Sequence, residues 1–126
     1  MTGPPMTALV WAGVVLVGGA GSVLRFLVDR TVGRRLSRPF PFGTLAVNIS
    51  GATLLGFLGG VALSKEAALL AGTAFVGAYT TFSTWMLETQ RLGEERQAWA
   101  ALGNIVVSVV LGVAAALLGQ RIAAQF

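Results

Sequence analysis

The sequence predicts an all-α membrane protein in which four helices cross the bilayer. Apolar residue types make up 55% of the 126 residues and charged types only 11%, whereas soluble domains carry about 25% charged residues. The mean hydropathy of +0.77 agrees with that composition. Four stretches of 21 to 26 residues contain no charge, and each is long enough to span a membrane as a helix: residues 1–24, 39–64, 67–87 and 97–120.

The same composition excludes several other classes of protein. The chain has no cysteine and no histidine, so it lacks disulfides, thiol nucleophiles and the usual general base, and we expect no enzyme. A soluble bundle would need a polar face on each helix, and a signal peptide would need a basic segment before its apolar stretch. The net charge of +4 is spread around the apolar stretches, so we expect membrane lipid and no nucleic acid as its surroundings.

We expect one domain, residues 1–126, with approximate spans at 8–31, 43–64, 66–91 and 97–121. The longest link contains Pro39 and Pro41, which stop helices. With four spans, both termini lie on one side of the membrane. The links after the first and third spans, with their flanks, hold six arginines, against two basic residues on the terminal side: Arg30, Arg34, Arg35, Arg38, Arg91 and Arg96 against Lys65 and Arg121. The positive-inside rule therefore predicts a multi-pass protein of the plasma (inner) membrane with extracytoplasmic termini.

The first two spans each carry a polar residue at membrane depth. Arg25 lies six residues before the end of the first span; it either snorkels to the interface or attracts anions at a pore mouth. Asn48 lies one turn into the second span, on the same helix face as Thr44. Its amide donors suit an anion path or an interhelical hydrogen bond. Gly56 and Gly60 form a GxxxG pair, which is typical of close helix packing.

The third span contains the most specific pattern in the chain, Gly77-Ala78-Tyr79-Thr80-Thr81-Phe82-Ser83-Thr84. A continuous helix does not favour a glycine followed by this many hydroxyl residues at bilayer depth. A broken helix does, because its free carbonyls and N–H groups bind ions where they line an enclosed cavity. The carbonyls suit Na⁺ and the N-terminus of the following half-helix suits an anion. A packing seam rich in Ser and Thr is the alternative.

The third and fourth spans also predict a face that lines a path. Phe82 and Trp85 are three residues apart and share one helix face, where their positive ring edges suit weak contact with an anion, or simple packing. Asn104, Ser108 and Gly112 follow at intervals of four and form one stripe.

These residues resemble the Fluc (CrcB) fluoride channels over nearly the whole chain. The segments that carry the resemblance are Gly21-Ser22-Val23-Leu24-Arg25, Pro41 to Asn48, and Gly77 to Glu88. The resemblance implies a dual-pored dimer of antiparallel subunits through which fluoride leaves the cytoplasm passively. It also implies a structural, untransported Na⁺ on the backbone carbonyls of Gly77 and Thr80.

The resemblance places further roles on particular residues. Asn48 is expected to be the pore asparagine, Phe82 the first ring of an aromatic box, and Arg25 the vestibule arginine. The remaining expected pathway residues are Trp85, Thr81, Ser83, Thr84, Asn104 and Ser108.

Three features of the chain depart from the family pattern. Trp85 stands where the family usually has Phe, and Tyr79 where a small or aliphatic residue is usual. Asn104 stands where an aromatic hydroxyl is common, and Gly112 replaces the last hydroxyl of that stripe. Some family members pair two different subunits of fixed orientation, and these departures and the arginine bias suit that arrangement better than a dual-topology homodimer. The expected partner is therefore a second Fluc subunit, either an identical chain or a homologous one.

Two other functions are weighed against the channel. A proton-coupled exporter of cationic drugs needs a carboxylate deep in the membrane. The second half of the third span has one carboxylate, Glu88, and this residue lies near the end of the span. Replacing Glu88 by alanine would abolish such exchange. A non-transporting assembly subunit would explain the GxxxG pair but not the hydroxyl residues at the expected break.

Overall fold

The computed structural model describes residues 4–36 and 39–126, and within these residues every regular element is a helix. The elements in order are α1 (Pro4–Leu36), α2 (Phe42–Gly60), α3 (Lys65–Ala68), the π-helix η1 (Leu69–Val76), α4 (Gly77–Tyr79), α5 (Ser83–Glu94) and α6 (Ala98–Ala123). The prediction of an all-α chain is confirmed. Arg38, one of the arginines used to predict orientation, lies outside the described residues.

Three of these helices, α1, α2 and α6, are long and apolar enough to cross a membrane. The third predicted span, 66–91, falls instead on a succession of shorter helices from α3 to α5, of which the longest has 12 residues. Thr80 has an extended backbone with φ −82° and ψ 163°, and residues 80–82 belong to no helix. We call residues 80–82 the helix discontinuity.

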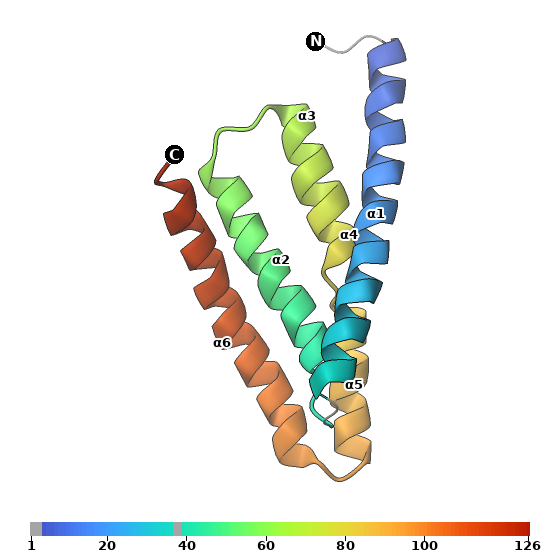
Figure 1. The fold of residues 1–126 in the computed structure, drawn as a ribbon, viewed down its shortest axis with the longest axis vertical. Helices are drawn as coiled ribbons and strands as arrows, with labels where there is room; N and C mark the ends of the chain where they lie inside the picture. The colour runs from blue at the N-terminus through green and yellow to red at the C-terminus, as the bar shows by residue number, and fades with distance from the viewer. Residues whose placement is uncertain (1–3, 37–38) are drawn as a thin grey trace.

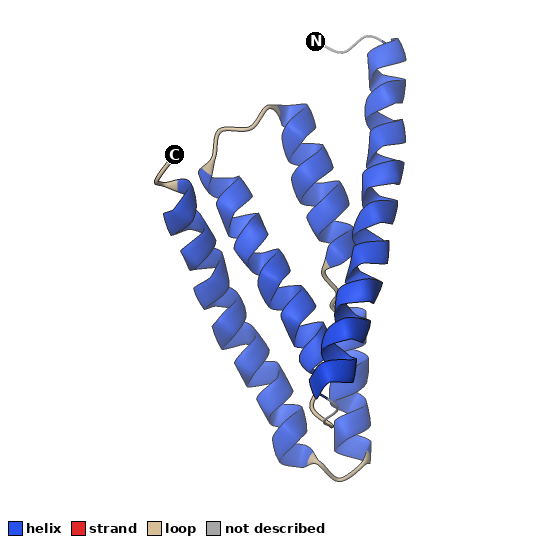
Figure 2. Ribbon diagram, viewed as in Figure 1, coloured by secondary structure: helices blue, strands red, loops and turns tan. Residues whose placement is uncertain are grey.

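The helices run alongside one another between two ends of the molecule (Figure 1). The start of α1, the C-terminus and the α2–α3 connection lie at one end, and the C-terminal end of α1, the start of α2 and the α5–α6 connection lie at the other (Figures 1 and 2). The chain therefore passes an even number of times between the two ends, with the helix discontinuity part-way along its third passage.

Glycines allow α2 and α6, the most extensive helix pair, to approach closely. A Cβ atom at Gly56 would collide with the backbone of Ala116, and one at Gly119 would collide with the carbonyl of Thr53. On α1, a Cβ atom at Gly21 would lie 2.7 Å from the carbonyl oxygen of Phe75 in η1. Small residues at helix crossings are typical of membrane proteins, in which packing replaces the hydrophobic drive between helices.

The burial pattern is the reverse of a soluble core. Large apolar side chains of α1 and α6 face outward, such as Leu16 and Val110, which are 73% and 60% exposed. The side chains with almost no exposure include two polar ones, Thr44 at 2% and Asn104 at 1%. Such a surface suits contact with lipid. Polar groups buried in a membrane protein are candidates for a functional site.

Candidate functional site

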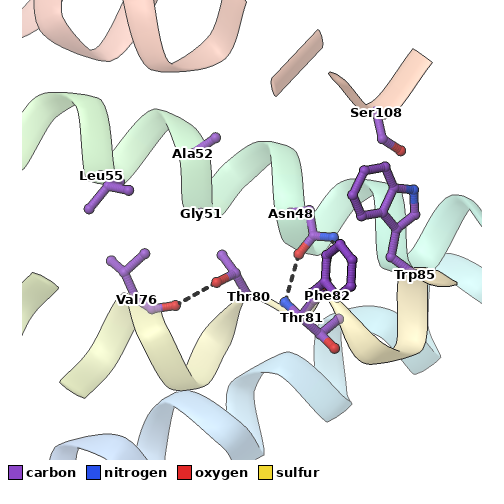
Figure 3. Close-up of a pocket in the computed structure, with 10 residues that line it drawn as sticks. All are labelled: Asn48, Gly51, Ala52, Leu55, Val76, Thr80, Thr81, Phe82, Trp85 and Ser108. Atoms are coloured by element: carbon purple, nitrogen blue, oxygen red, sulfur yellow. Dashed lines mark hydrogen bonds between the residues drawn. The ribbon is translucent and has the colours of Figure 1, made fainter. Parts of the chain in front are cut away.

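The helix discontinuity borders a cavity of about 310 Å³. Residues from four helices and from the discontinuity line it: Asn48, Gly51, Ala52 and Leu55 of α2, Val76 of η1, Thr80, Thr81 and Phe82 of the discontinuity, Trp85 of α5 and Ser108 of α6. Figure 3 shows the amide of Asn48, both aromatic rings and the hydroxyl of Ser108 grouped at one end of this cavity. Leu55 and Val76 lie at its other end, which is apolar.

Asn48 joins α2 to the helix discontinuity through two hydrogen bonds. The backbone N–H of Thr81 donates to Asn48 Oδ1 over 2.8 Å, and Asn48 Nδ2 donates to the carbonyl oxygen of Thr81 over 2.9 Å. The side-chain amide therefore replaces helical partners that Thr81 has lost. Since the amide nitrogen carries two hydrogens, one donor of Asn48 is left for the cavity.

The half-helices on either side of the discontinuity end in different ways. Thr80 closes the first, because its N–H and its hydroxyl each donate to the carbonyl oxygen of Val76 over 2.9 Å. The second half-helix, α5, begins at Ser83, and the hydroxyl of Thr81 just before it accepts the N–H of Thr84 over 3.2 Å. This bond satisfies one of the N–H groups that have no helical partner at a helix N-terminus.

These end arrangements leave backbone carbonyls without their helical partners. The N–H of Thr81 goes to Asn48 rather than to the carbonyl of Gly77, and the N–H of Thr84 goes to the Thr81 hydroxyl rather than to the carbonyl of Thr80. In the described part of the chain no hydrogen bond to the carbonyls of Gly77 or Thr80 is found. Free carbonyl oxygens are the ligand type that a hard cation such as Na⁺ prefers.

Arg25 contacts the same region from α1. Its Nε donates to the carbonyl oxygen of Ala78 over 3.3 Å. The cation thus lies at the C-terminal end of the first half-helix, where the helix dipole is negative. The carbonyl of Ala78, which Arg25 binds, lies in the sequence between the carbonyls of Gly77 and Thr80.

Phe82 and Trp85 face each other beside Asn48. Their ring centroids are 5.7 Å apart and the ring planes meet at 84°, an edge-to-face arrangement. Phe82 is 69% exposed although it is a large apolar residue. The expected aromatic pair therefore comes together in the structure, but one of its rings is largely uncovered by this chain.

The two expected polar residues of α6 lie in different surroundings. Asn104 is buried between α5 and α6, where it bonds to Trp85 and Thr89 and not to the cavity. Ser108 lines the cavity, and its buried hydroxyl has no hydrogen-bond partner among the described residues. Ser83 is exposed and Thr84 is half-buried, and neither lines this cavity.

The comparisons with known proteins agree with this arrangement. The profile of the family described as "CrcB-like protein, Camphor Resistance (CrcB)" matches residues 12–120. This chain belongs to the CrcB family. A relative from Mycolicibacterium paratuberculosis, named fluoride-specific ion channel FluC 2, is 79% identical over 93% of this chain and 96% of its own. A protein of the same name from Mycobacterium tuberculosis is 76% identical over 94% of each chain. Fluoride-specific ion channel FluC 1 from Nocardia farcinica is 47% identical over 81% of this chain and 72% of its own.

Two contacts of this CrcB chain were not predicted from its sequence. The hydroxyl of Tyr79 pairs with Ser50 Oγ over 2.8 Å, and its ring stacks on Phe75 with 5.9 Å between centroids. Thr89 accepts from Asn104 and donates to the carbonyl of Trp85. Tyr79 was noted as a departure from the family, but its partner lies 29 residues away, and no spacing in the sequence indicates it.

Proposed function

We propose that this chain is a subunit of a fluoride-specific ion channel that lets F⁻ leave the cytoplasm passively and so reduces fluoride toxicity. Two relatives at 76% and 79% identity bear the name of such a channel. The observation that carries the proposal is the cavity at the helix discontinuity, where a free amide donor, a free hydroxyl and two aromatic rings meet. The family membership favours this function over a multidrug exporter, an assembly subunit or an enzyme.

The chemistry of the cavity suits a small anion. Fluoride holds its water tightly, so a pore must replace that water with hydrogen-bond donors. The second N–H of Asn48 and the hydroxyl of Ser108 are such donors, and the edges of Phe82 and Trp85 add weak positive potential. Arg25 raises the potential for anions nearby. Chloride is larger and would be rejected by width and by donors spaced for a smaller ion.

A structural Na⁺ is the cofactor that we propose beside this path. The carbonyl oxygens of Gly77 and Thr80 would hold it, and their lack of amide partners supports that role. The break in the third transmembrane helix would serve this purpose, supported by the extended backbone at Thr80. When bound, the ion supplies fixed positive charge and ties the two half-helices together; it is not transported.

The channel that we propose is an antiparallel dimer. The cavity is open on one side, and the ring of Phe82 is exposed there. Lipid is a poor cover for this ring because polar groups lie beside it. A second subunit, identical or homologous, would supply it. The arginine bias supports a fixed orientation in the inner membrane, with the termini outside and a homologous partner of opposite orientation. Equal insertion of this chain in both orientations would contradict the fixed-orientation part.

Fluoride efflux from liposomes that contain only this purified chain tests the function. A dimer of identical subunits should lose F⁻ rapidly and lose no Cl⁻ under the same gradient, whereas a channel that needs the homologous partner should lose neither ion in this preparation. If folded protein passes neither ion, the assay is repeated with the homologous partner chain co-reconstituted. Efflux only in the mixture supports an obligate heterodimer, and no fluoride efflux in either preparation refutes the proposed function.

A further inference from the structure

Two residues of α2 hold the two sides of the helix discontinuity. On the side where the second half-helix follows, Asn48 accepts the N–H of Thr81 over 2.8 Å. On the other side, the hydroxyl of Tyr79 pairs with Ser50 Oγ, also over 2.8 Å. Because Asn48 and Ser50 are two residues apart on one continuous helix, both sides of the discontinuity are tied to the same rigid element.

Tyr79 is the donor in its bond with Ser50. The single hydroxyl hydrogen of Ser50 goes to the backbone carbonyl of Val47 over 3.1 Å, so Ser50 Oγ offers only its lone pairs to Tyr79. Tyr79 is 7% exposed, and a buried phenolic hydroxyl needs such a partner. The bond therefore satisfies the polar end of a side chain that is otherwise enclosed.

The ring of Tyr79 is enclosed by its own half-helix and by α2. It stacks on Phe75 of η1, with 5.9 Å between the centroids and 7° between the planes. A Cβ atom at Gly51 would lie 3.3 Å from Tyr79 Cδ2 and would collide with the methyl group of Thr80. The backbone of α2 thus supports the end of the first half-helix, and the hydroxyl bond fixes where along α2 that end lies.

The two carbonyls without amide partners lie on the two sides that these bonds hold. Gly77 belongs to α4, the helix that ends at Tyr79. The carbonyl of Thr80 shares one planar peptide unit with the N–H of Thr81, so the bond from that N–H to Asn48 sets the direction of the carbonyl. The separation of the two carbonyl oxygens therefore depends on where α4 is held along α2.

The other hydrogen bonds at this end do not fix that placement. The N–H and the hydroxyl of Thr80 both bind the carbonyl of Val76, which lies in the same half-helix. Arg25 binds the carbonyl of Ala78 from α1, so it does not tie this end to α2. Among the described residues, only the tyrosine hydroxyl joins α4 to α2 by a hydrogen bond.

We propose that Tyr79 is a positioning residue for the structural Na⁺, because its bond to Ser50 sets the separation of the carbonyl oxygens of Gly77 and Thr80. This inference rests on the proposed function in one respect, the ion on those two carbonyls. The hydroxyl of Tyr79 is directed to α2 and is no ligand. Without it the end of α4 moves more freely along α2, and Na⁺ binding itself has to order the two carbonyls.

Thermal stabilisation by Na⁺ measures this role without any fluoride. The melting temperature of the protein in detergent is followed as Na⁺ replaces N-methylglucamine at constant ionic strength. Tyr79→Phe keeps the ring and its stacking but removes the hydroxyl. We expect the Na⁺ concentration that gives a set rise in melting temperature to increase about fivefold, the factor that corresponds to one hydrogen bond.

This measurement separates positioning from a merely structural role. A structural role would lower the melting temperature equally at every Na⁺ concentration, and the Na⁺ concentration needed for the set rise would stay the same. That result in folded Tyr79→Phe protein would overturn the proposal. A wild-type melting temperature that does not respond to Na⁺ would also overturn it.

A double-mutant cycle tests whether the effect depends on Ser50. Ser50→Ala removes the acceptor, and we expect it to raise the Na⁺ requirement by a similar factor. Added to Tyr79→Phe, it should change the requirement by less than about twofold, because the bond is already absent; full additivity would overturn the role of the pair. Thr53→Val is the matched control, since its hydroxyl bonds to Ile49 within α2. An equal increase in this control would overturn the specific role of Tyr79.

The proposed function and this inference fail separately when fluoride efflux is recorded for the same variants. If no preparation carries fluoride while Tyr79→Phe raises the Na⁺ requirement, the channel function is wrong and the positioning role stands. If fluoride passes while the Na⁺ requirement is unchanged, the function stands and this inference is wrong. Should Tyr79→Phe not fold, Ser50→Ala carries the same test, because it removes the same hydrogen bond from the side of α2.

Discussion

Asn48→Leu should destabilise the helix discontinuity selectively. The substitution keeps the side-chain volume but removes the two hydrogen bonds, of 2.8 and 2.9 Å, that the amide makes with the backbone of Thr81. A buried polar group left without a partner costs about 1–3 kcal/mol. The Asn48–Thr81 bonds are only part-buried, so the lower end applies to each of the two groups. The expected total is about 2 kcal/mol.

Hydrogen–deuterium exchange of the Thr81 amide measures this cost directly. Exchange requires the N–H to lose its partner, so its rate follows the local opening equilibrium. A cost of about 2 kcal/mol corresponds to about 30-fold faster exchange at Thr81. Amides in the middle of α6 should exchange at their original rates, because their helical bonds do not depend on Asn48.

Thr53→Val provides the matched control on the same helix. The hydroxyl of Thr53 donates to the carbonyl of Ile49 within α2 over 3.0 Å, and makes no bond to the discontinuity. This variant should leave the exchange of Thr81 within about twofold of the wild-type rate. If folded Asn48→Leu protein also stays within that range, the amide does not hold the discontinuity, and the reasoning is refuted.

Three further outcomes follow from the packing and the charges. Gly119→Val should overpack α2 against α6 at a cost of about 1–3 kcal/mol and so lower the melting temperature of the protein in detergent. Gly59→Val should leave the melting temperature unchanged, because nothing lies within 4 Å of a Cβ atom at that site. Equal shifts of the two melting temperatures would contradict the close crossing of α2 and α6. Arg25→Met should slow fluoride efflux and weaken its dependence on ionic strength, because a screened positive charge is lost; an unchanged salt dependence would show that the charge of Arg25 does not act on the ion. Replacing Na⁺ by N-methylglucamine should lower the melting temperature, because Na⁺ at about 100 times its Kd would stabilise the folded protein by about 2.7 kcal/mol. Equal melting temperatures in the two cations would argue against the structural ion.

Features set by composition and local pattern could be predicted from the sequence. The all-α class followed from the charge-free stretches, because their length matches a bilayer. The residues at the discontinuity stood out because Gly77 and the hydroxyl residues after it suit a helix poorly. The comparisons confirm the family to which these patterns pointed. Asn48, Thr81, Phe82 and Trp85 line one cavity in the structure; their roles in ion passage stay predictions.

The direction in which each polar side chain bonds could not be predicted. The sequence placed Asn104 and Ser108 on one helical stripe, and both were expected to line the path. The structure separates them, because the partners of Asn104 are Trp85 and Thr89 on another helix. A helical spacing states which residues share a face, but the neighbouring helix decides which of them meets a cavity and which meets a backbone carbonyl.

The hydrogen-bond pattern also narrows the set of groups that face an ion. The hydroxyl hydrogen of Thr80 is engaged by Val76, and both amide hydrogens of Asn104 are engaged by α5. The second N–H of Asn48 and the hydroxyl hydrogens of Thr81 and Ser108 have no acceptor among the described residues. These few donors do not replace the full hydration shell of fluoride. We therefore predict that the open side of the cavity, where Phe82 is exposed, receives further donors or ring edges from the second subunit proposed above, and that selectivity depends on assembly.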